Sequence, residues 1–298
     1  MDMLRITGLR KHFGDKTVLN GLELTVPKNS IFGFIGQNGA GKTTTMKTVL
    51  GLLQADDGEI FVDGEKVVYG QTPTNRHIGY LPDVPEFYSF MTAPEYLRFC
   101  GQITGMKADE IDSRSKELLD LVGLGEERHR IKGFYRGMKP RLGIAQALLN
   151  RPKLLICDEP TSALDPVGRK EILDILLAAR AQTTVLFSTH ILSDVERICT
   201  DIAFLHGGKT VIQGKLSDIK AQYRSDNYLV ETETTADAAA LRQVFPAMGG
   251  SGNHLIFSEK TYDPFAVIGA LADRRVAVMK VERMEPTLES LFMEVVEK

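Results

Sequence analysis

The 298-residue sequence contains no tryptophan, only three cysteines and no long hydrophobic run. No stretch approaches the roughly 18 uninterrupted apolar residues of a membrane-spanning helix, so we expect none here. The cysteines, Cys100, Cys157 and Cys199, are odd in number and far apart, which fits a reducing compartment and excludes the usual metal spacings. A net charge of −3 provides no basic footprint for nucleic acid. The first residues lack a charged stretch followed by an apolar one, so we expect no signal peptide.

The composition that is present is that of an ordinary globular protein, with 43% hydrophobic and 25% charged residues. A chain of this length can bury one large core and a second, smaller one. Strand and helix patterns alternate over residues 1–219, which predicts an α/β domain with a mostly parallel sheet. Apolar, β-branched runs at 4–9 and 17–26 flank a short turn. They predict a hairpin or small antiparallel sheet at the start of this domain. A helical stretch at about 88–150 is interpreted as a subdomain inserted into this core.

The remaining segments of the first domain follow from local patterns and turn residues. We expect strands at 31–35, 58–64, 77–81, 154–157 and 184–188 and helices at 43–51, 94–100, 107–121, 138–149 and 167–180. The composition changes after Gly214, and residues 220–298 predict a separate, small α+β domain. Its expected strands are 228–233, 254–258 and 276–282, and its expected helices are 236–245, 264–273 and 287–296. We find no catalytic pattern in this second domain.

The most informative segment is 36–43, whose sequence GQNGAGKT matches the phosphate-loop pattern G-x-x-x-x-G-K-[ST]. Glycines let backbone N–H groups surround a phosphate because no β-carbon stands in the way. Lys42 can place a cation between the β- and γ-phosphates, and the Thr43 hydroxyl can bind Mg²⁺. The strand at 31–35 precedes the loop and the helix at 43–51 follows, so the helix N-terminus adds partial positive charge. The segment therefore predicts a nucleotide site.

An accidental glycine loop is the competing interpretation of this segment. The strand–loop–helix frame argues against it, because the pattern binds phosphate only in that setting. The residues that we expect to contact the nucleotide are Gly36, Asn38, Gly39, Ala40, Gly41, Lys42, Thr43 and Thr44.

A second half of the site is predicted where two further strands end. The strand at 154–157 leads into Asp158 and Glu159, and ligands of open α/β sheets collect at such carboxyl ends. Asp158 can hold Mg²⁺ through water, and Glu159 can then orient and deprotonate an attacking water. His190 follows the next strand, at 184–188, and can donate a hydrogen bond to the γ-phosphate. Solvated acids at a strand end are the plainer alternative.

Taken in order, these motifs resemble the ATP-binding subunit of ABC transporters, over residues 1 to about 220. Besides the loop and the acid pair, the resemblance includes an adenine-stacking aromatic residue, a Q-loop, a signature segment, a D-loop and an H-switch. These features correspond to Phe13, the region near Asp83, residues 134–138, residues 162–165 and His190. Residues 285–292 resemble part of the C-terminal accessory domain of ABC-2-type exporter ATPases, a branch that includes drug, bacitracin, lantibiotic-immunity and sodium exporters.

The resemblance implies a P-loop NTPase fold and an ATPase that uses ATP and Mg²⁺. It assigns catalysis to Glu159 and His190, the metal to Thr43, Asp83 and Asp158, and further nucleotide contacts to Phe13, Tyr135 and Gly137. Two subunits would sandwich two ATP molecules, each site pairing the phosphate loop of one chain with the signature of the other. A separate transmembrane permease would carry the cargo outward. The chain itself would be peripheral at the cytoplasmic face and would touch the membrane only through the permease.

The sequence departs from the family pattern at two places. Position 83 is Asp where Gln is usual, which keeps a hard oxygen for Mg²⁺ but adds negative charge near the γ-phosphate. In the signature, Tyr135 replaces a small hydroxyl residue and Arg136 replaces a glycine, while Gly137 remains ahead of a helix. Backbone N–H groups at that helix start can still meet a phosphate. Arg136 either supplies charge to the γ-phosphate or lies in solvent, and Phe13 either stacks on adenine or packs at a strand end.

Two other classes of function stay open at this point. An ABC ATPase of a non-transport assembly shares the motifs, although the insertion here is too short for the long coiled coil of DNA-repair relatives. A small-molecule kinase with a phosphate loop would not require the signature, D-loop and histidine in sequence. The cargo, and the choice between a homodimer and a heterodimer, do not follow from these residues.

Overall fold

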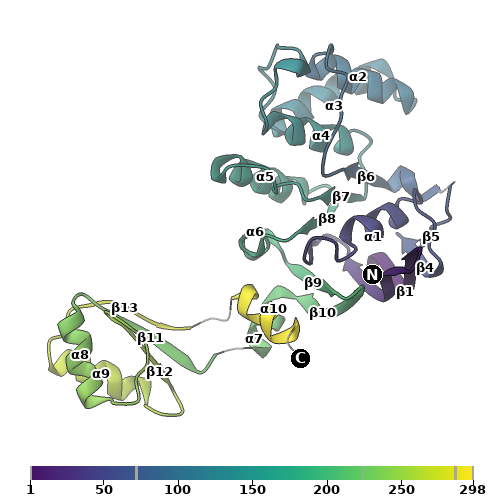
Figure 1. The fold of residues 1–298 in the computed structure, drawn as a ribbon. Helices are drawn as coiled ribbons and strands as arrows, with labels where there is room; N and C mark the ends of the chain where they lie inside the picture. Colours follow the sequence, from purple (N-terminus) through teal and green to yellow (C-terminus); the bar gives the residue numbers. More distant parts are fainter. Residues whose placement is uncertain (1, 71–72, 224, 285–286, 297–298) are drawn as a thin grey trace. The chain divides into compact units, whose positions relative to one another are not determined.

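The computed structural model describes residues 2–70, 73–223, 225–284 and 287–296 of the chain (Figure 1). The chain divides into two compact units, Met1–Leu216 and Ser217–Lys298, which are described separately below. Among the described residues, every helix is too short or too polar to cross a lipid bilayer.

The first unit begins with the predicted hairpin, which is confirmed and belongs to a four-stranded antiparallel sheet. The strands are β1 (Asp2–Phe13), β2 (Lys16–Pro27), β4 (Asp57–Val62) and β5 (Glu65–Lys66), in the order β2-β1-β4-β5. Gly14 has φ +56° in the turn between β1 and β2, a conformation that glycine adopts without a steric penalty. Inward-facing leucines and isoleucines alternate with exposed residues along β1, so one face of this sheet is available for a core.

The second sheet has six strands, all parallel to their neighbours except the edge strand β10. Its strands are β3 (Ile31–Ile35), β6 (Ile78–Leu81), β7 (Leu154–Asp158), β8 (Thr184–Thr189), β9 (Asp201–His206) and β10 (Lys209–Lys215). The order is β10-β9-β3-β8-β7-β6. Every residue of β3, β7 and β8 is buried, as expected for strands covered on both faces. This topology brings the carboxyl ends of those three strands to one edge.

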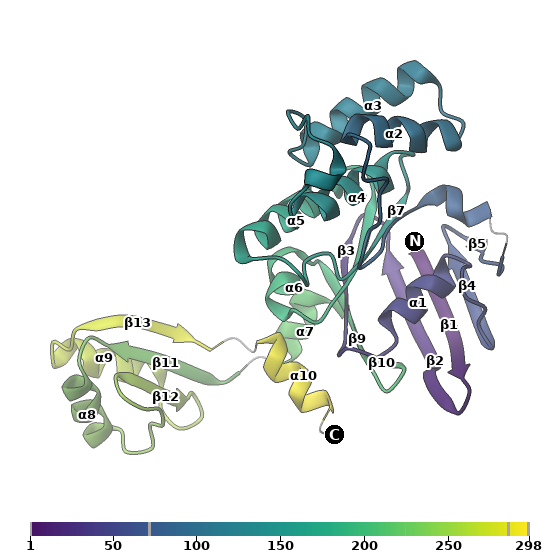
Figure 2. The ribbon, with the colours of Figure 1, turned by 45° about the horizontal axis from the view of Figure 1, so that its top comes forward.

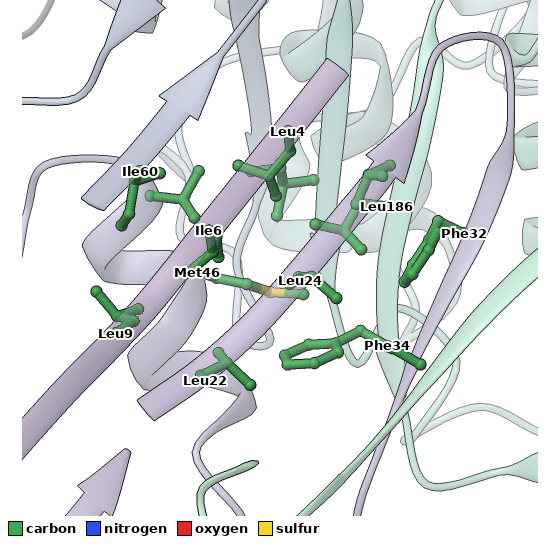
Figure 3. Close-up of a cluster of buried hydrophobic side chains, with 14 of the residues drawn as sticks. Leu4, Ile6, Leu9, Leu22, Leu24, Phe32, Phe34, Met46, Ile60 and Leu186 are labelled. Atoms are coloured by element: carbon green, nitrogen blue, oxygen red, sulfur yellow. The ribbon is translucent and has the colours of Figure 1, made fainter. Parts of the chain in front are cut away.

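Helix α1 (Lys42–Val49) lies between the two sheets, while α5 (Pro166–Ala179) and α6 (Leu192–Ile198) cover the opposite face of the parallel sheet (Figure 2). The core between the sheets joins side chains from β1, β2, β3, β4, β8 and α1 (Figure 3). Its members include Leu4, Ile6, Leu9, Leu22, Leu24, Phe32, Phe34, Met46, Ile60 and Leu186. Because β3 and α1 are both anchored there, the loop that connects them is held at its two ends.

The helices expected between 88 and 150 are present as α2 (Ala93–Ile103), α3 (Ala108–Leu121) and α4 (Met138–Leu148). A capping box starts α2, in which Thr92 Oγ1 accepts from the Glu95 N–H and the Glu95 carboxylate accepts from the Thr92 N–H. Short 3-10 turns occupy Pro73–His77 and Ile131–Gly133. Residues 192–219, for which no elements were predicted, form α6, β9, β10 and the start of α7 (Leu216–Gln222).

The second unit contains the predicted alternation of strands and helices. A three-stranded antiparallel sheet, ordered β12-β11-β13, is formed by β11 (Asn227–Thr232), β12 (His254–Ser258) and β13 (Val278–Arg283). Besides most of α7, its helices in the described residues are α8 (Thr235–Val244), α9 (Pro264–Asp273) and α10 (Leu288–Val296). Buried side chains of β11, β12, α8 and α9 form a separate core around Val230, Leu241 and Phe257. The first two residues of the family-like segment 285–292, Glu285 and Pro286, lie outside the described residues.

Candidate nucleotide site

The predicted phosphate loop connects β3 to α1 and depends on its glycines. Gly39 and Gly41 have φ values of +82° and +110°, which residues with a β-carbon rarely adopt. A β-carbon at Gly41 would lie 2.8 Å from Leu19 Cδ2 on β2, so the loop also packs closely against the antiparallel sheet. At Gly36 a β-carbon would meet the Leu205 carbonyl oxygen on β9 at 2.8 Å. Space and backbone conformation therefore both require glycine in this loop.

A pocket of about 320 Å³ opens in front of this loop. The residues expected from the sequence that line it are Asn38, Gly39, Gly41, Lys42, Thr43, Thr44, Asp83 and Glu159. Lys16 and Val18 of β2 complete the lining, and no motif had identified them. Their only sequence signal was their place on the hairpin just after Phe13. A larger cavity of about 510 Å³ is lined by residues of α2, α3 and the loop after α3, none of which belongs to the phosphate loop or the acid pair.

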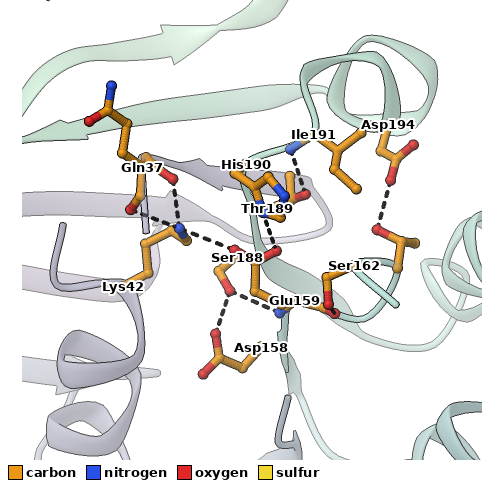
Figure 4. A network of polar contacts seen from close by, with 12 residues as sticks. Gln37, Lys42, Asp158, Glu159, Ser162, Ser188, Thr189, His190, Ile191 and Asp194 are labelled. Carbon is orange, nitrogen blue, oxygen red and sulfur yellow. Dashed lines mark hydrogen bonds and ion pairs between the residues drawn. The ribbon is translucent and has the colours of Figure 1, made fainter. Parts of the chain in front are cut away.

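Lys42 joins the phosphate loop to the acid pair (Figure 4). Its Nζ donates to the carbonyl oxygens of Gly36 at 2.6 Å and Gln37 at 3.2 Å. The same nitrogen lies 3.1 Å from Glu159 Oε1, an ion pair that lacks hydrogen-bond geometry. The Lys42 side chain is only 6% exposed, so this cation is held by the protein and little by water. Its attraction for an anion in the pocket is therefore weakly screened.

Glu159 adopts an unusual backbone conformation directly after β7. Its φ is +48°, a left-handed value that costs a residue with a β-carbon about 1 kcal/mol or more. The Glu159 N–H points at both Ser188 O (3.2 Å) and Ser188 Oγ (3.1 Å) on the neighbouring strand β8. The side chain reaches His190, whose Nδ1 lies 2.9 Å from Glu159 Oε2. The tertiary structure thus brings together Lys42, Glu159 and His190.

Asp158 has the environment expected of a metal-binding carboxylate. It is 1% exposed, and its Oδ1 accepts from Ser188 Oγ at 2.6 Å. Its Oδ2 is buried and has no hydrogen-bond partner in the described part of the chain. A buried carboxylate oxygen without a donor is costly unless a cation or an ordered water satisfies it. The residues present therefore fit Mg²⁺ at this position.

Asp83 also lines the pocket, close enough to the acid pair to be affected by its negative charge. Its pKa is raised, first by burial and then by the carboxylates of Asp158 and Glu159, while a hydrogen bond with Ser162 opposes the shift. Across the described ranges, no three His, Cys, Asp or Glu side chains converge as a metal cluster. Coordination of Mg²⁺ would thus have to be completed by the Thr43 hydroxyl, phosphate oxygens and water.

Five of the predicted nucleotide contacts do not line the pocket. Gly36 and Ala40 lie within the loop itself, where the Ala40 N–H donates to Gln37 O at 3.1 Å. The Phe13 ring is 49% exposed at the end of β1, with Lys11 Nζ 5.4 Å from its centroid. Tyr135 and Gly137 belong to the α4 end of the insertion. Tyr135 is 67% exposed, and Gly137 is the N-cap residue of α4.

A buried network that the sequence analysis missed supports the segment after Glu159. Thr161 Oγ1 donates to Asp194 Oδ2 at 2.7 Å, and Arg169 donates to Asp194 Oδ1 at 2.6 Å. Ser162 Oγ donates to the Glu159 carbonyl at 3.1 Å. Because Asp194 lies in the first turn of α6, which follows His190, this network ties the acid pair to the histidine loop. Asp194 is 33 residues from Thr161 and 25 residues from Arg169 along the chain, so no local pattern reveals these pairs.

Comparison with known proteins agrees with this geometry. The ABC transporter family profile matches residues 19–162, and the profile of the C-terminal domain of DrrA1-3-like ATP-binding proteins matches residues 214–296. The bacitracin transport ATP-binding protein BcrA of Bacillus licheniformis is 39% identical over 226 residues, which is 74% of this chain and 72% of that protein. The linearmycin resistance ATP-binding protein LnrL of Bacillus subtilis is 30% identical over 302 residues, covering 98% and 97%.

A solved structure of an ATP-binding subunit of an ABC transporter superposes with a TM-score of 0.65 at 32% identity. It covers 74% of this chain and 93% of its own. Together with the phosphate loop, the acid pair and the two-sheet core, these similarities establish that the chain belongs to the ATP-binding proteins of ABC transporters, as an ATPase with a DrrA-like C-terminal domain.

Proposed function

We propose that this chain hydrolyses Mg–ATP to drive export through a separate transmembrane permease, as a dimer that sandwiches two ATP molecules. The observation that carries the proposal is the contact of Glu159 with both Lys42, at 3.1 Å, and His190, at 2.9 Å, at the mouth of the phosphate-loop pocket. A base, a phosphate-binding cation and a histidine at the same point are what hydrolysis of a γ-phosphate requires.

We assign a role to each predicted residue in or beside the pocket. The backbone N–H groups of 38–44 and the Lys42 ammonium bind the phosphates. Thr43, Asp83 and Asp158 would hold the metal. When bound, Mg²⁺ would neutralise developing charge on the β- and γ-phosphates. Glu159 orients and deprotonates the attacking water, and His190 donates a hydrogen bond to the γ-phosphate.

The positions of the signature residues support the proposed dimer. Tyr135 and Gly137 do not line the pocket of their own chain, so a second copy or a related subunit would supply them to it. Gly137 caps α4, whose first-turn N–H groups can meet a phosphate across the interface. Phe13, exposed at the end of β1, would stack on adenine.

A partnership with a permease is supported by an exposed apolar surface next to Asp83. Val84, Tyr88 and Phe90 are all more than half exposed in the segment that leads to α2, and the rings of Tyr88 and Phe90 lie 5.9 Å apart. Exposed aromatic clusters of this kind are typical of protein interfaces. A membrane subunit docked there would be coupled to the metal site through Asp83, and the chain would be peripheral at the cytoplasmic face.

Export is inferred from the relatives and from the tail. Two relatives are named for bacitracin transport and for linearmycin resistance, and the DrrA-like match extends over residues 214–296. We propose that residues 1–219 form the ATPase cassette, with a helical subdomain at about 88–150, and that residues 220–298 form an accessory domain.

Purification of the native complex tests the proposal as a whole. We expect a tagged full-length chain, extracted in mild detergent, to bring down a multispanning membrane protein and a second ATPase subunit. Identification by mass spectrometry decides between a homodimer and a heterodimer. A complex without any membrane protein, obtained after cross-linking in cells, would contradict the transport role.

Replacing the two large residues of the signature segment by small ones is expected to accelerate ATP turnover. The double change Tyr135→Ser with Arg136→Gly removes two large side chains ahead of α4 and should raise the ATPase rate about fivefold, or ~1 kcal/mol in the barrier. Phosphate release by the purified chain measures it. Tyr69→Ser, at another exposed tyrosine, is the matched control and should leave the rate unchanged. An equal rate in the double variant would remove the idea that the altered signature slows hydrolysis.

Removing residues 220–298 is expected to leave ATP affinity within about twofold of the full chain. The pocket lining runs from Lys16 to Glu159, entirely within the first unit, which has its own core. Equilibrium binding of a fluorescent ATP analogue measures the affinity, and the thermal unfolding midpoint reports whether the shortened chain folds. Loss of binding by a folded truncation would place a determinant of the site in the tail.

A further inference from the structure

Ser188 of β8 lies beside the two acidic residues at the end of β7, and no motif assigns it a role. In the parallel register of these strands, Asp158 pairs directly with Ser188. Both residues are buried, at 1% and 0% exposure. The Ser188 hydroxyl donates to Asp158 Oδ1 at 2.6 Å and accepts from the Glu159 N–H at 3.1 Å (Figure 4). One hydroxyl therefore contacts the side chain of one acidic residue and the backbone of the next.

The chemistry of the partners sets the direction of both bonds. An ionised carboxylate can only accept, and a backbone N–H can only donate, so the hydroxyl proton goes to Asp158 and a lone pair faces Glu159. An apolar side chain at position 188 would break both bonds at once. Because the site is shielded from water, neither partner could recover its bond from solvent.

The first consequence concerns the orientation of the Asp158 carboxylate. With Oδ1 held by Ser188, Oδ2 is the oxygen that has no hydrogen-bond partner in the described residues. A carboxylate free to rotate would present either oxygen to a metal, at an entropic cost when one is chosen. The bond from Ser188 fixes the orientation of the carboxylate and leaves Oδ2 available to a metal.

The second consequence concerns the Glu159 backbone. Its φ of +48° persists only if the surroundings hold it, and the two bonds from its N–H to Ser188 O and Oγ do so. From this conformation the Glu159 side chain reaches both Lys42 and His190. Loss of the hydroxyl would leave only the longer bond, to Ser188 O at 3.2 Å.

We propose that Ser188 is a positioning residue that aligns Asp158 for the metal and Glu159 for the attacking water. This inference rests on the proposed function, because it takes Asp158 as the residue that holds the metal. It predicts an effect on metal binding that is separate from the effect on turnover. Partners that orient a metal ligand typically contribute tenfold to a hundredfold in affinity or rate.

The test compares Ser188→Ala with Ser188→Thr, which keeps the hydroxyl, and with Thr184→Val. Thr184 is a matched control because it lies on the same strand, is equally buried and uses its Oγ1 to accept from the Asn29 N–H, away from the pocket. The readout is Mn²⁺ binding to the ATP-saturated full chain, followed by electron paramagnetic resonance. Binding of a fluorescent ATP analogue in EDTA and the thermal unfolding midpoint are measured in parallel.

We expect Ser188→Ala to weaken Mn²⁺ binding about tenfold or more, with metal-free nucleotide binding within about twofold of the parent. Ser188→Thr should restore metal binding, and Thr184→Val should leave it unchanged. If the alanine variant fails to fold, Ser188→Cys, of similar size but a weak donor, should weaken metal binding in the same direction. Unchanged Mn²⁺ binding in a folded alanine or cysteine variant would overturn the proposal.

Asp158→Asn separates this inference from the function beneath it. If Asp158→Asn weakens Mn²⁺ binding and Ser188→Ala does not, only the role of Ser188 is wrong. If Asp158→Asn also leaves Mn²⁺ binding unchanged, the metal assignment in the proposed function is wrong. A general loss of folding stability would lower the unfolding midpoint of Ser188→Ala and Thr184→Val alike, without a selective effect on Mn²⁺.

Discussion

Glu159→Gln is expected to abolish ATP turnover, by at least about 100-fold, while ATP binding persists. The amide cannot take a proton from water, yet it has nearly the size of the carboxylate and can still accept from a donor. It also removes a negative charge next to the γ-phosphate, so bound ATP should be retained. With ATP unhydrolysed, the sandwich of two chains should be stabilised. Phosphate release measures turnover, and light scattering after size-exclusion chromatography with Mg–ATP measures the dimer.

The control for this change is Glu110→Gln, on the exposed surface of α3. Glu110 pairs only with Arg151 in the described structure, at 3.3 Å, so its loss should cost less than about 1 kcal/mol of stability and no activity. Turnover that continued in Glu159→Gln would mean that another group activates the water. The Glu159–His190 contact would then be structural only.

Lys42→Ala is expected to weaken ATP binding by at least about 100-fold, because it removes a charge-assisted bond to phosphate at a buried position. The change also leaves Glu159 without its counter-ion, and this uncompensated carboxylate repels the incoming anion. Equilibrium binding of a fluorescent ATP analogue measures the effect. The expected phenotype is thus opposite to that of Glu159→Gln, which separates binding from chemistry.

Lys47→Ala is the matched control for Lys42→Ala, because Lys47 lies on the same helix but is exposed. It should change ATP affinity less than about twofold. Lys42→Met, which keeps the length of the side chain, distinguishes lost charge from lost packing and should resemble Lys42→Ala. If both Lys42 variants bound ATP as tightly as the parent, the pocket at residues 36–43 would not be the nucleotide site.

Much of the fold was predictable because its signals are local. The strand at 31–35, the glycine loop and α1 are contiguous, so periodicity and glycine placement were enough to locate them. The C-terminal strands and helices were likewise found within a few residues of their observed bounds. The stretch from α6 to β10 was missed. The edge strand β10 alternates exposed and half-buried residues. Its strand conformation depends on pairing with β9, which its own composition does not reveal.

The residues of the candidate site also fall into two groups, those that motifs predicted and those that only the structure revealed. Lys42, Asp158, Glu159 and His190 follow from motifs, each read at the end of a strand or in a loop. Ser188 was visible only as part of a strand end, since its role depends on a register that places it opposite Asp158. Lys16 and Val18 of β2, and the Asp194 network, were not identified at all.

The sequence alone determined that a phosphate loop, two acids and a histidine occur in the order and spacing of an ATPase, because backbone conformation and side-chain chemistry are properties of short segments. Only the tertiary structure decided which oxygen of Asp158 lacks a partner, that Glu159 adopts a left-handed conformation, and that one serine holds them both. The physical reason is that hydrogen bonds across parallel strands join residues about 30 positions apart, and no local preference encodes such a contact.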